Sequence, residues 1–573
     1  MPRLNLALRF LFTILTSSVS CCFLWASPND SLPHPADLVL RDAAVYTVDA
    51  ARTWAEAIAI DEGRIVYVGT NEGVIPWIGQ ETDVLSLKGS MILPGFHDSH
   101  VHLVTGGIEL GECNLLDLDT QAGLLEAIRR YAEAHPDEEW IRGGGWELPA
   151  FPGANPHKRL LDAVVPDRPV FLTAADGHSA WVNSAALTRA GITRTTPDPP
   201  YGRIEREPAT GEPTGTLREE AMQLVMAHMP TYTAEDYLEG LRRGLAMANR
   251  FGITSIQEAS ASKEILEAYY TLDQQGELTV RVVASVKADL SRGEAQIPQF
   301  IAWRDAYQSP HLRIHTVKIF ADGVIEARTA AMLEPYLDRK DSRGTLNLEP
   351  DSLHQLITAL DKAEFQVHVH AIGDRAIRTT LGAFAEARKQ NGIRESRHHM
   401  AHIQLIDSID VLRFRPLGVI ANFQPLWAYA DTYITELTEP ALGLSRSRWL
   451  YPIASVIKTG AMVVFGSDWS VSSMNPLDGM QVGVTRLGLE DSTGTPWIPQ
   501  ERADLATMIA GYTINGAYLN FEEKETGSIE VGKAADLVVL DRNLFDVSPK
   551  NIHQVRVLLT LLEGKIVYKA ETW

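Results

Sequence analysis

The feature that most constrains the fold is a series of short apolar runs separated by longer segments with helical periodicity. Amphipathic stretches at 352–365 and 374–390 are examples of the longer segments. This alternation is typical of parallel strands joined by helical crossovers. Eight such strands predict an α/β fold, a TIM-like (β/α)8 barrel whose functional residues lie at the C-terminal strand ends. The runs span residues 94–103, 253–260, 279–286, 315–323, 365–374, 397–406, 418–426 and 462–469.

The two ends of the chain resemble each other. The segment EGRIVY at 62–67 returns as EGKIVY at 563–568, and both read as a turn followed by a strand. We therefore expect residues 36–93 and 520–573 to form one small composite β-sandwich domain, with the barrel, over 94–519, inserted between them. A length of 573 residues suits two or three domains.

The gap between the first and second strands, residues 105–250, is too long for a single helix. It contains helical patterns, turns rich in Pro and Gly, and the hairpin pattern GRIEREPATGEPTGTL. A long insertion at the active-site end of a barrel usually shapes or covers the pocket. We interpret it as a lid or substrate domain, with a simple linker as the alternative.

The first 26 residues differ in composition from the rest of the chain. Arg3 and Arg9 precede an apolar, Ser-rich run, which predicts a signal peptide over 1–26 and export to the periplasm or the medium. Lipidation of Cys21 and an uncleaved membrane anchor are the alternatives. Only Cys113 lies downstream of this segment, so no intramolecular disulfide is expected in the mature chain.

The charge balance restricts the partners. Lys and Arg total 52 against 73 for Asp and Glu, a net charge of −21 that repels nucleic acid and anionic lipid surfaces. We expect a small-molecule substrate, no nucleic-acid partner and no membrane partner beyond an N-terminal anchor. A homo-oligomer is left open.

Six residues could carry the chemistry. His100 and His102 lie two apart, which in a strand places both imidazoles on one face as half of a metal site. Later strands end near Lys318, His370, His402 and Asp468. Imidazoles suit Zn²⁺, and a carboxylate can both bind the metal and accept a proton from its water. A buried lysine has a lowered pKa and could react with CO₂ to give a carbamate.

The chain resembles the amidohydrolase superfamily, in its family 3 branch of N-substituted formamide deformylases and exoenzyme-regulatory-protein-like metal-dependent hydrolases. The motifs that carry this resemblance, spread in order over nearly all of the chain from residue 37, are PGFHDSHVH, DGHSAWVNSAAL, EPTGTLRE, GITSIQE, VKIFADGVIEARTAAM, VHAIGDRA, HIQLI, FGSDW, YTINGAY and GSIEVGKAADLVVLD.

The resemblance implies a role for each site residue. His100 and His102 resemble the ligands of the first strand, and Lys318 resembles a bridging, carboxylated lysine. The ligands of the fifth and sixth strands correspond to His370 and His402, and Asp468 corresponds to a carboxylate that binds metal and acts as general base.

Some positions depart from the pattern or stay outside it. Ala401 stands where relatives commonly have Glu, and His399 is an additional imidazole nearby. His368 shares a face with His370, but the motif selects His370. We interpret His97, on the opposite strand face from His100, as structural.

The expected activity is hydrolysis of a non-peptide C–N bond, an amide, by water activated on one or two divalent ions, with Zn²⁺ as the expected metal. Asp468 and Lys318 are the catalytic candidates. The alternatives are a lactone or ester hydrolase on the same site and a non-catalytic binding homologue. Asp176 and His178 are expected near the substrate pocket, whereas Trp146, Trp181 and Trp427 line the pocket or belong to the core.

Overall fold

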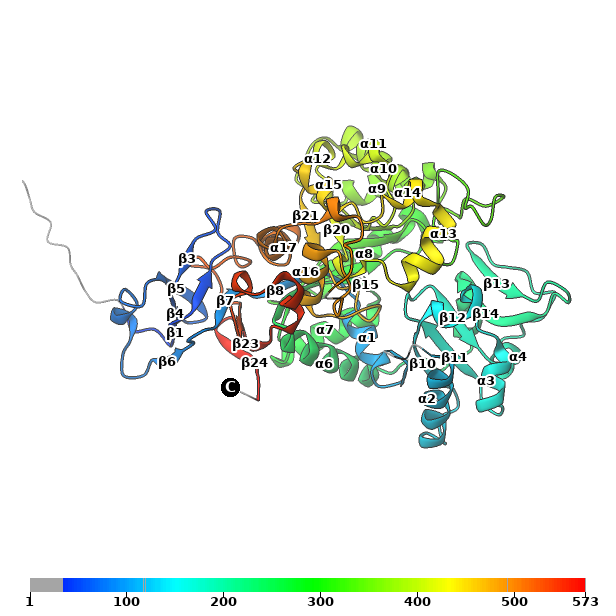
Figure 1. The fold of residues 1–573 in the computed structure, drawn as a ribbon, viewed down its shortest axis with the longest axis horizontal. Coiled ribbons are helices and arrows are strands. Elements are labelled where there is room, and N and C mark those ends of the chain that lie inside the picture. Colours follow the sequence, from blue (N-terminus) through cyan, green and yellow to red (C-terminus); the bar gives the residue numbers. More distant parts are fainter. Residues whose placement is uncertain (1–33, 117, 119, 492, 572–573) are drawn as a thin grey trace, which may run out of the picture.

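The computed structural model describes residues 34–571 except 117, 119 and 492. The predicted signal peptide lies outside the described residues. Among the described helices, none has both the length and the apolar character needed to span a membrane. The barrel lies between two smaller parts, which stand at opposite ends of the long axis of the molecule (Figure 1).

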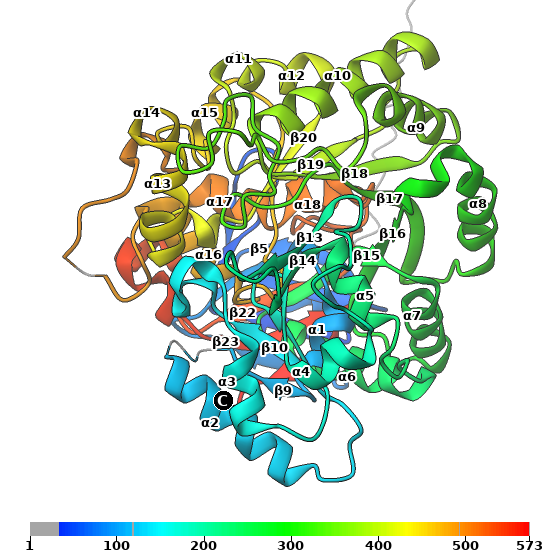
Figure 2. The same cartoon turned by 90° about the vertical axis from the view of Figure 1, so that its right-hand side faces the viewer.

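Eight parallel strands form the barrel, as expected, and neighbours in sequence are neighbours in the sheet. The first and last strands approach each other, because Asp468 N, just after the last strand, donates to His100 O at 2.7 Å. Helices form the outer layer (Figure 2). The strands are β8 (Phe96–Val101), β15 (Ile253–Ala261), β16 (Arg281–Lys287), β17 (Leu312–Phe320), β18 (Gln366–Ala371), β19 (His399–His402), β20 (Ile420–Phe423) and β21 (Val463–Phe465).

The expected amphipathic segments are helices. The stretch at 352–365 lies largely within α9 (Pro350–Lys362), and the stretch at 374–390 lies within α10 (Asp374–Asn391). The other helices of the barrel region are α1 (Leu103–Glu109), α6 (Ala234–Arg250), α7 (Lys263–Gln275), α8 (Ile297–Ala306), α11 (Ser408–Val411), α12 (Phe414–Leu417), α13 (Glu439–Leu442), α14 (Leu444–Ser447), α15 (Ile453–Lys458), α16 (Pro476–Thr485), α17 (Leu505–Gly511) and α18 (Ile514–Leu519).

Strands from both chain ends share one sheet. The antiparallel pairing of β7 (Met91–Pro94) with β22 (Leu537–Leu540) joins them. The two similar turns also touch, since a Cβ at Gly63, whose φ is +76°, would lie 2.8 Å from Glu563 O. The six-stranded sheet also contains β2 (Ala44–Tyr46), β3 (Trp54–Ala55), β23 (Val557–Leu562) and β24 (Lys565–Lys569), and a second, four-stranded sheet contains β1 (Leu38–Arg41), β4 (Ala57–Asp61), β5 (Arg64–Gly69) and β6 (Asp83–Ser86).

The insertion after the first barrel strand has a sheet of its own. The expected hairpin is present, with β13 (Gly202–Arg206) antiparallel to β14 (Pro213–Glu219). Trp146 and Trp181 are fully buried in the insertion's own core. The remaining elements are β9 (Cys113–Asn114), β10 (Ile141–Trp146), β11 (Val170–Ala174), β12 (Ser179–Val182), α2 (Gln121–Ala134), α3 (Lys158–Val164), α4 (Ser184–Arg189) and α5 (Gln223–Met226).

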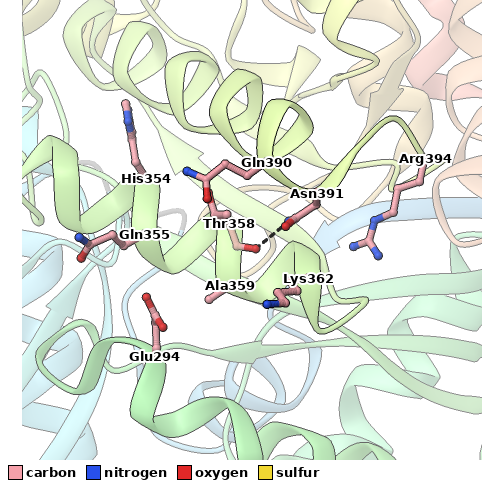
Figure 3. A pocket seen from close by; sticks show the side chains of 9 residues that line it. All are labelled: Glu294, His354, Gln355, Thr358, Ala359, Lys362, Gln390, Asn391 and Arg394. Atoms are coloured by element: carbon pink, nitrogen blue, oxygen red, sulfur yellow. Dashed lines mark hydrogen bonds between the residues drawn. The ribbon is translucent and has the colours of Figure 1, made fainter.

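A surface hollow of about 590 Å³ lies on the outer layer between α9 and α10 (Figure 3). Two of its lining residues are hydrogen-bonded to each other, since Asn391 Nδ2 donates to Thr358 O at 2.9 Å. The lining contains none of the six candidate site residues, so we assign the hollow no part in the chemistry.

Candidate metal centre

Three of the predicted ligands meet where the barrel closes. His100 and His102, at the end of β8, and Asp468, after β21, offer ligand atoms that all lie within 4.8 Å of one another. Asp468 Oδ1 is 3.3 Å from His100 Nε2 and 3.1 Å from His102 Nε2. Only His102 is partly exposed, with a quarter of its side chain accessible.

The carboxylate of Asp98 holds this arrangement together. Its Oδ1 accepts from His100 N at 3.1 Å and from Ser467 N at 2.9 Å, and its Oδ2 accepts from Ser467 Oγ at 2.5 Å. Burial raises the pKa of Asp98 to about 7 despite these donors. The contacts fasten the end of β8 to the loop that carries Asp468, so the two halves of the site keep one relative position.

The other three predicted residues lie beside this group. Lys318 Nζ is 3.3 Å from His100 Nε2, and His402 Nδ1 is 3.8 Å from Asp468 Oδ2. The His402 ring lies 4.8 Å from the His100 ring and 4.6 Å from the His370 ring, between centroids. The structure therefore brings all six residues to the C-terminal end of the barrel.

The electrostatics favour neutral imidazoles beside an ionised carboxylate. Burial and the Lys318 charge lower the pKa of His100 to about 3, and burial lowers the pKa of His370 and of His402 well below the usual range. Burial alone would raise the pKa of Asp468, but the adjacent imidazoles, His100 first, hold it well below normal. Burial also lowers the pKa of Lys318 to about 7.

This donor set fits a divalent metal ion. Neutral imidazole nitrogens and an ionised carboxylate are the protonation states that metal binding requires. Asp468 Oδ1 is buried and makes no hydrogen bond of acceptable geometry within the described part of the chain. A buried oxygen without a hydrogen donor is costly unless a cation compensates it.

In His402 and His370, one ring nitrogen makes a hydrogen bond, which leaves the other nitrogen of each ring available to a metal ion. His402 Nδ1 donates to Gln424 Oε1 at 2.8 Å, which leaves Nε2 for a ligand. His370 Nε2 donates to Gly323 O at 3.2 Å, which leaves Nδ1. Such outer partners orient metal-binding histidines. Gln424 was not predicted from the sequence, although it directly follows β20 just as other polar site residues lie at strand ends.

His178, which belongs to the insertion, lies beside His370 at the C-terminal end of the barrel. Its ring centroid is 5.2 Å from that of His370, and its Nδ1 is 2.9 Å from Glu219 Oε2. Burial opposes charge on His178, but the Glu219 carboxylate raises its pKa to about 9. Thr329 Oγ1, from the loop after β17, donates to Glu219 Oε1 at 2.7 Å. Asp176 lies in the same turn, where its Oδ1 accepts from His178 N at 3.0 Å.

Glu219 was not singled out in the sequence, because its partner lies 41 residues away and only the strand pairing brings the two together. Of the three tryptophans, Trp427 stacks on His402, with 5.8 Å between the ring centroids. Trp146 and Trp181 belong to the core.

An eight-stranded parallel barrel with clustered imidazoles and a carboxylate at its C-terminal end is the architecture of metal-dependent hydrolases. Residues 83–568 match the Amidohydrolase family, and the chain belongs to that family. Family membership identifies the protein as a hydrolase.

The chain is similar to proteins from plants, bacteria and archaea. It is 29% identical to Protein LONG AFTER FAR-RED 3 of Arabidopsis thaliana, over 95% of this chain and 94% of that one. It is 28% identical to N-substituted formamide deformylase of Arthrobacter pascens, over 93% and 98%. An uncharacterized metal-dependent hydrolase from Pyrococcus horikoshii shares the fold, with a TM-score of 0.70, 24% identity and coverage of 89% and 99%.

Proposed function

We propose that the protein hydrolyses a non-peptide C–N bond, an amide of modest size. The observation that carries this proposal is the convergence of the ionised Asp468 carboxylate, whose Oδ1 makes no hydrogen bond of acceptable geometry among the described residues, with imidazoles at the barrel end. The residues that would hold a divalent ion, with Zn²⁺ as the expected one, are His100, His102, His370, His402 and Asp468. A carbamate on Lys318 would add an anionic ligand between two ions.

A divalent ion in this site would supply a water of lowered pKa and polarise the carbonyl oxygen of the substrate. Asp468 is the proton acceptor of the reaction, because its carboxylate stays ionised and lies within 3.3 Å of His100 and His102. It takes a proton from the attacking water and returns it to the departing nitrogen.

The insertion supplies the substrate side of the pocket in this proposal. Glu219 holds His178 through Nδ1, so Nε2 is the ring atom left for a substrate oxygen or nitrogen. Asp176 supports the turn that carries His178. The relative from Arthrobacter pascens, named for deformylating an N-substituted formamide, supports an amide as the substrate class.

The test is a hydrolysis screen of purified protein loaded with Zn²⁺, against N-formyl amines, N-acyl amino acids, cyclic amides and lactones. Asp468→Asn should lower kcat by about 10²- to 10⁴-fold, the usual contribution of a general base. Asp478→Asn is the matched control, since Asp478 is also buried and, among the described residues, its carboxylate accepts hydrogen bonds only from Ser473 and Asn475, just before it in the chain. Turnover of lactones but not amides, or full activity of Asp468→Asn, would refute the proposal.

A further inference from the structure

A second buried histidine lies directly behind His100. His368, on β18, places Nε2 2.9 Å from His100 Nδ1, with the two rings nearly perpendicular at 86°. The other nitrogen of His368, Nδ1, is 3.1 Å from Ser285 Oγ on β16. All three side chains are fully buried, so water does not compete for these hydrogen bonds.

Only one arrangement of protons lets His100 serve as a ligand. The Nε2 of His100 faces Asp468 and Lys318, both at 3.3 Å, so its lone pair is available there only if the proton is on Nδ1. His100 Nδ1 then donates to His368 Nε2. Because that nitrogen accepts, the proton of His368 is on Nδ1 and is donated to Ser285 Oγ.

We propose that His368, held by Ser285, is a positioning residue that fixes the ring orientation and the tautomer of His100 for metal binding. The inference rests on the proposed function, because the metal site is the same. Partners of this kind are usually carboxylates, carbonyls or water. A neutral imidazole in this position orients His100 without adding negative charge behind it.

The chain offers a matched control in His399. It lies beside His368 in register on the neighbouring strand β19, and the two rings are 4.1 Å apart between centroids. His399 is equally buried, but neither of its ring nitrogens makes a hydrogen bond of acceptable geometry among the described residues. Replacing it changes the packing of the same region without removing a partner of His100.

The experiment compares three variants of the full chain, stripped of metal, with the wild type. His368→Leu removes the acceptor, His368→Gln keeps an acceptor oxygen at similar reach, and His399→Leu is the control. The readouts are the dissociation constant for Zn²⁺, by competition with a chromophoric chelator, and the thermal midpoint of the metal-free protein. We expect His368→Leu to weaken Zn²⁺ binding by about 10- to 100-fold. The dissociation constants of His368→Gln and His399→Leu should stay within about threefold of the wild-type value. The thermal midpoints of the metal-free variants should be similar.

Equal losses in His368→Leu and His399→Leu would overturn the proposal, because packing alone would then explain both. Equal losses in His368→Leu and His368→Gln would overturn it as well. If His368→Leu fails to fold, Ser285→Ala and Ser285→Thr decide: only Ser285→Ala should weaken Zn²⁺ binding, and equal affinities would overturn the proposal.

Hydrolysis is measured separately, so the two proposals fail in different ways. A wild type that binds Zn²⁺ and shows this pattern without hydrolysing any amide refutes the function and leaves the role of His368 in place. A wild type that hydrolyses an amide, together with unchanged Zn²⁺ affinity in His368→Leu, refutes the role of His368 and leaves the proposed function in place. A wild type that binds no Zn²⁺ overturns both.

Discussion

Replacing Asp361 by Asn should destabilise β18 and β19, the strands that carry two of the proposed metal ligands. Asp361, near the C-terminal end of α9, is 2% exposed. Its Oδ1 accepts from His398 Nε2 at 2.9 Å and from Arg394 Nη2 at 2.8 Å, and its Oδ2 accepts from Asn391 Nδ2 at 2.7 Å. His398 Nδ1 in turn accepts from Val367 N at 3.0 Å, so the cluster ties α9 to β18 and to the start of β19.

The loss in free energy of unfolding can be estimated from the hydrogen bonds that His398 and Arg394 lose. His398 is buried, and a buried donor left without its charged acceptor costs about 1–3 kcal/mol. The side chain of Arg394 is 31% exposed and is partly rehydrated, so it adds about 1 kcal/mol. A total of about 3 kcal/mol corresponds to a thermal midpoint lower by about 6 °C, since large domains shift by roughly 2 °C per kcal/mol.

The difference in stability between wild type and Asp361→Asn should become smaller as the pH falls. Burial alone would raise the pKa of Asp361, but hydrogen bonds from His398 and Asn391 and the charge of Arg394 lower it well below 3.8. A carboxyl group with a lowered pKa in the folded state stabilises the fold fully above its unfolded pKa, and less as the pH falls towards the folded value. The difference between wild type and Asp361→Asn should therefore be full at pH 7 and shrink below about pH 4.

The assay is thermal unfolding of metal-free protein, followed by circular dichroism at pH 7 and at the lowest pH where the wild type stays folded. Asp305→Asn is the control, because Asp305 is 69% exposed and its ion pair with Arg304 is long at 3.7 Å. Equal thermal midpoints of Asp361→Asn and Asp305→Asn at pH 7, or a difference between Asp361→Asn and wild type that grows as the pH falls, would contradict this prediction.

Three further outcomes are expected. Glu219→Gln should lower kcat/KM by about tenfold or more by releasing His178, whereas Glu207→Gln, in the comparable pair with His157, should not; equal effects would contradict this. With ¹³C-bicarbonate, the wild type should show a carbamate carbon signal by NMR that Lys318→Met lacks, and its absence from metal-loaded wild type would argue against a carboxylated lysine. N-terminal sequencing of protein from its native host should find Met1 removed, and an intact Met1 would contradict export.

The barrel, and the meeting of the six candidate residues at its C-terminal end, could be predicted from the sequence because both depend on local patterns. A strand end followed by a polar residue is visible in VHAIGD or FGSDW without knowledge of any partner. The partners that orient those residues left no such pattern. Asp98 lies within the first motif but gains its role from Ser467, 369 residues away, and Gln424 gains its role from His402 on the neighbouring strand.

His368 shows the same limit more sharply. The alternation of side chains in β18 places His368 and His370 on one face, so the sequence alone could select a ligand only by motif. The structure separates them by height along the barrel axis: His370, two residues further along, reaches the strand end beside His402, whereas His368 stays behind His100. Which of two such histidines binds a metal depends on the stagger of neighbouring strands, a long-range property.

Closure of the barrel is therefore a condition for the site as well as for the fold. The proposed ligands His100 and Asp468 come from the first strand and from the loop after the last strand, and their geometry depends on the contacts of Asp98 with Ser467 and of Asp468 N with His100 O. A barrel open between β8 and β21 would hold His100 and His102 on one side of the gap and the other three proposed ligands, His370, His402 and Asp468, on the other side. Only Gly95 separates β7 from β8, and β7 pairs with β22 from the other end of the chain. The small sheet therefore also holds the start of the first barrel strand in place. We therefore expect a change that weakens the pairing of β7 with β22 to weaken the metal site as well, because β7 leads directly into β8.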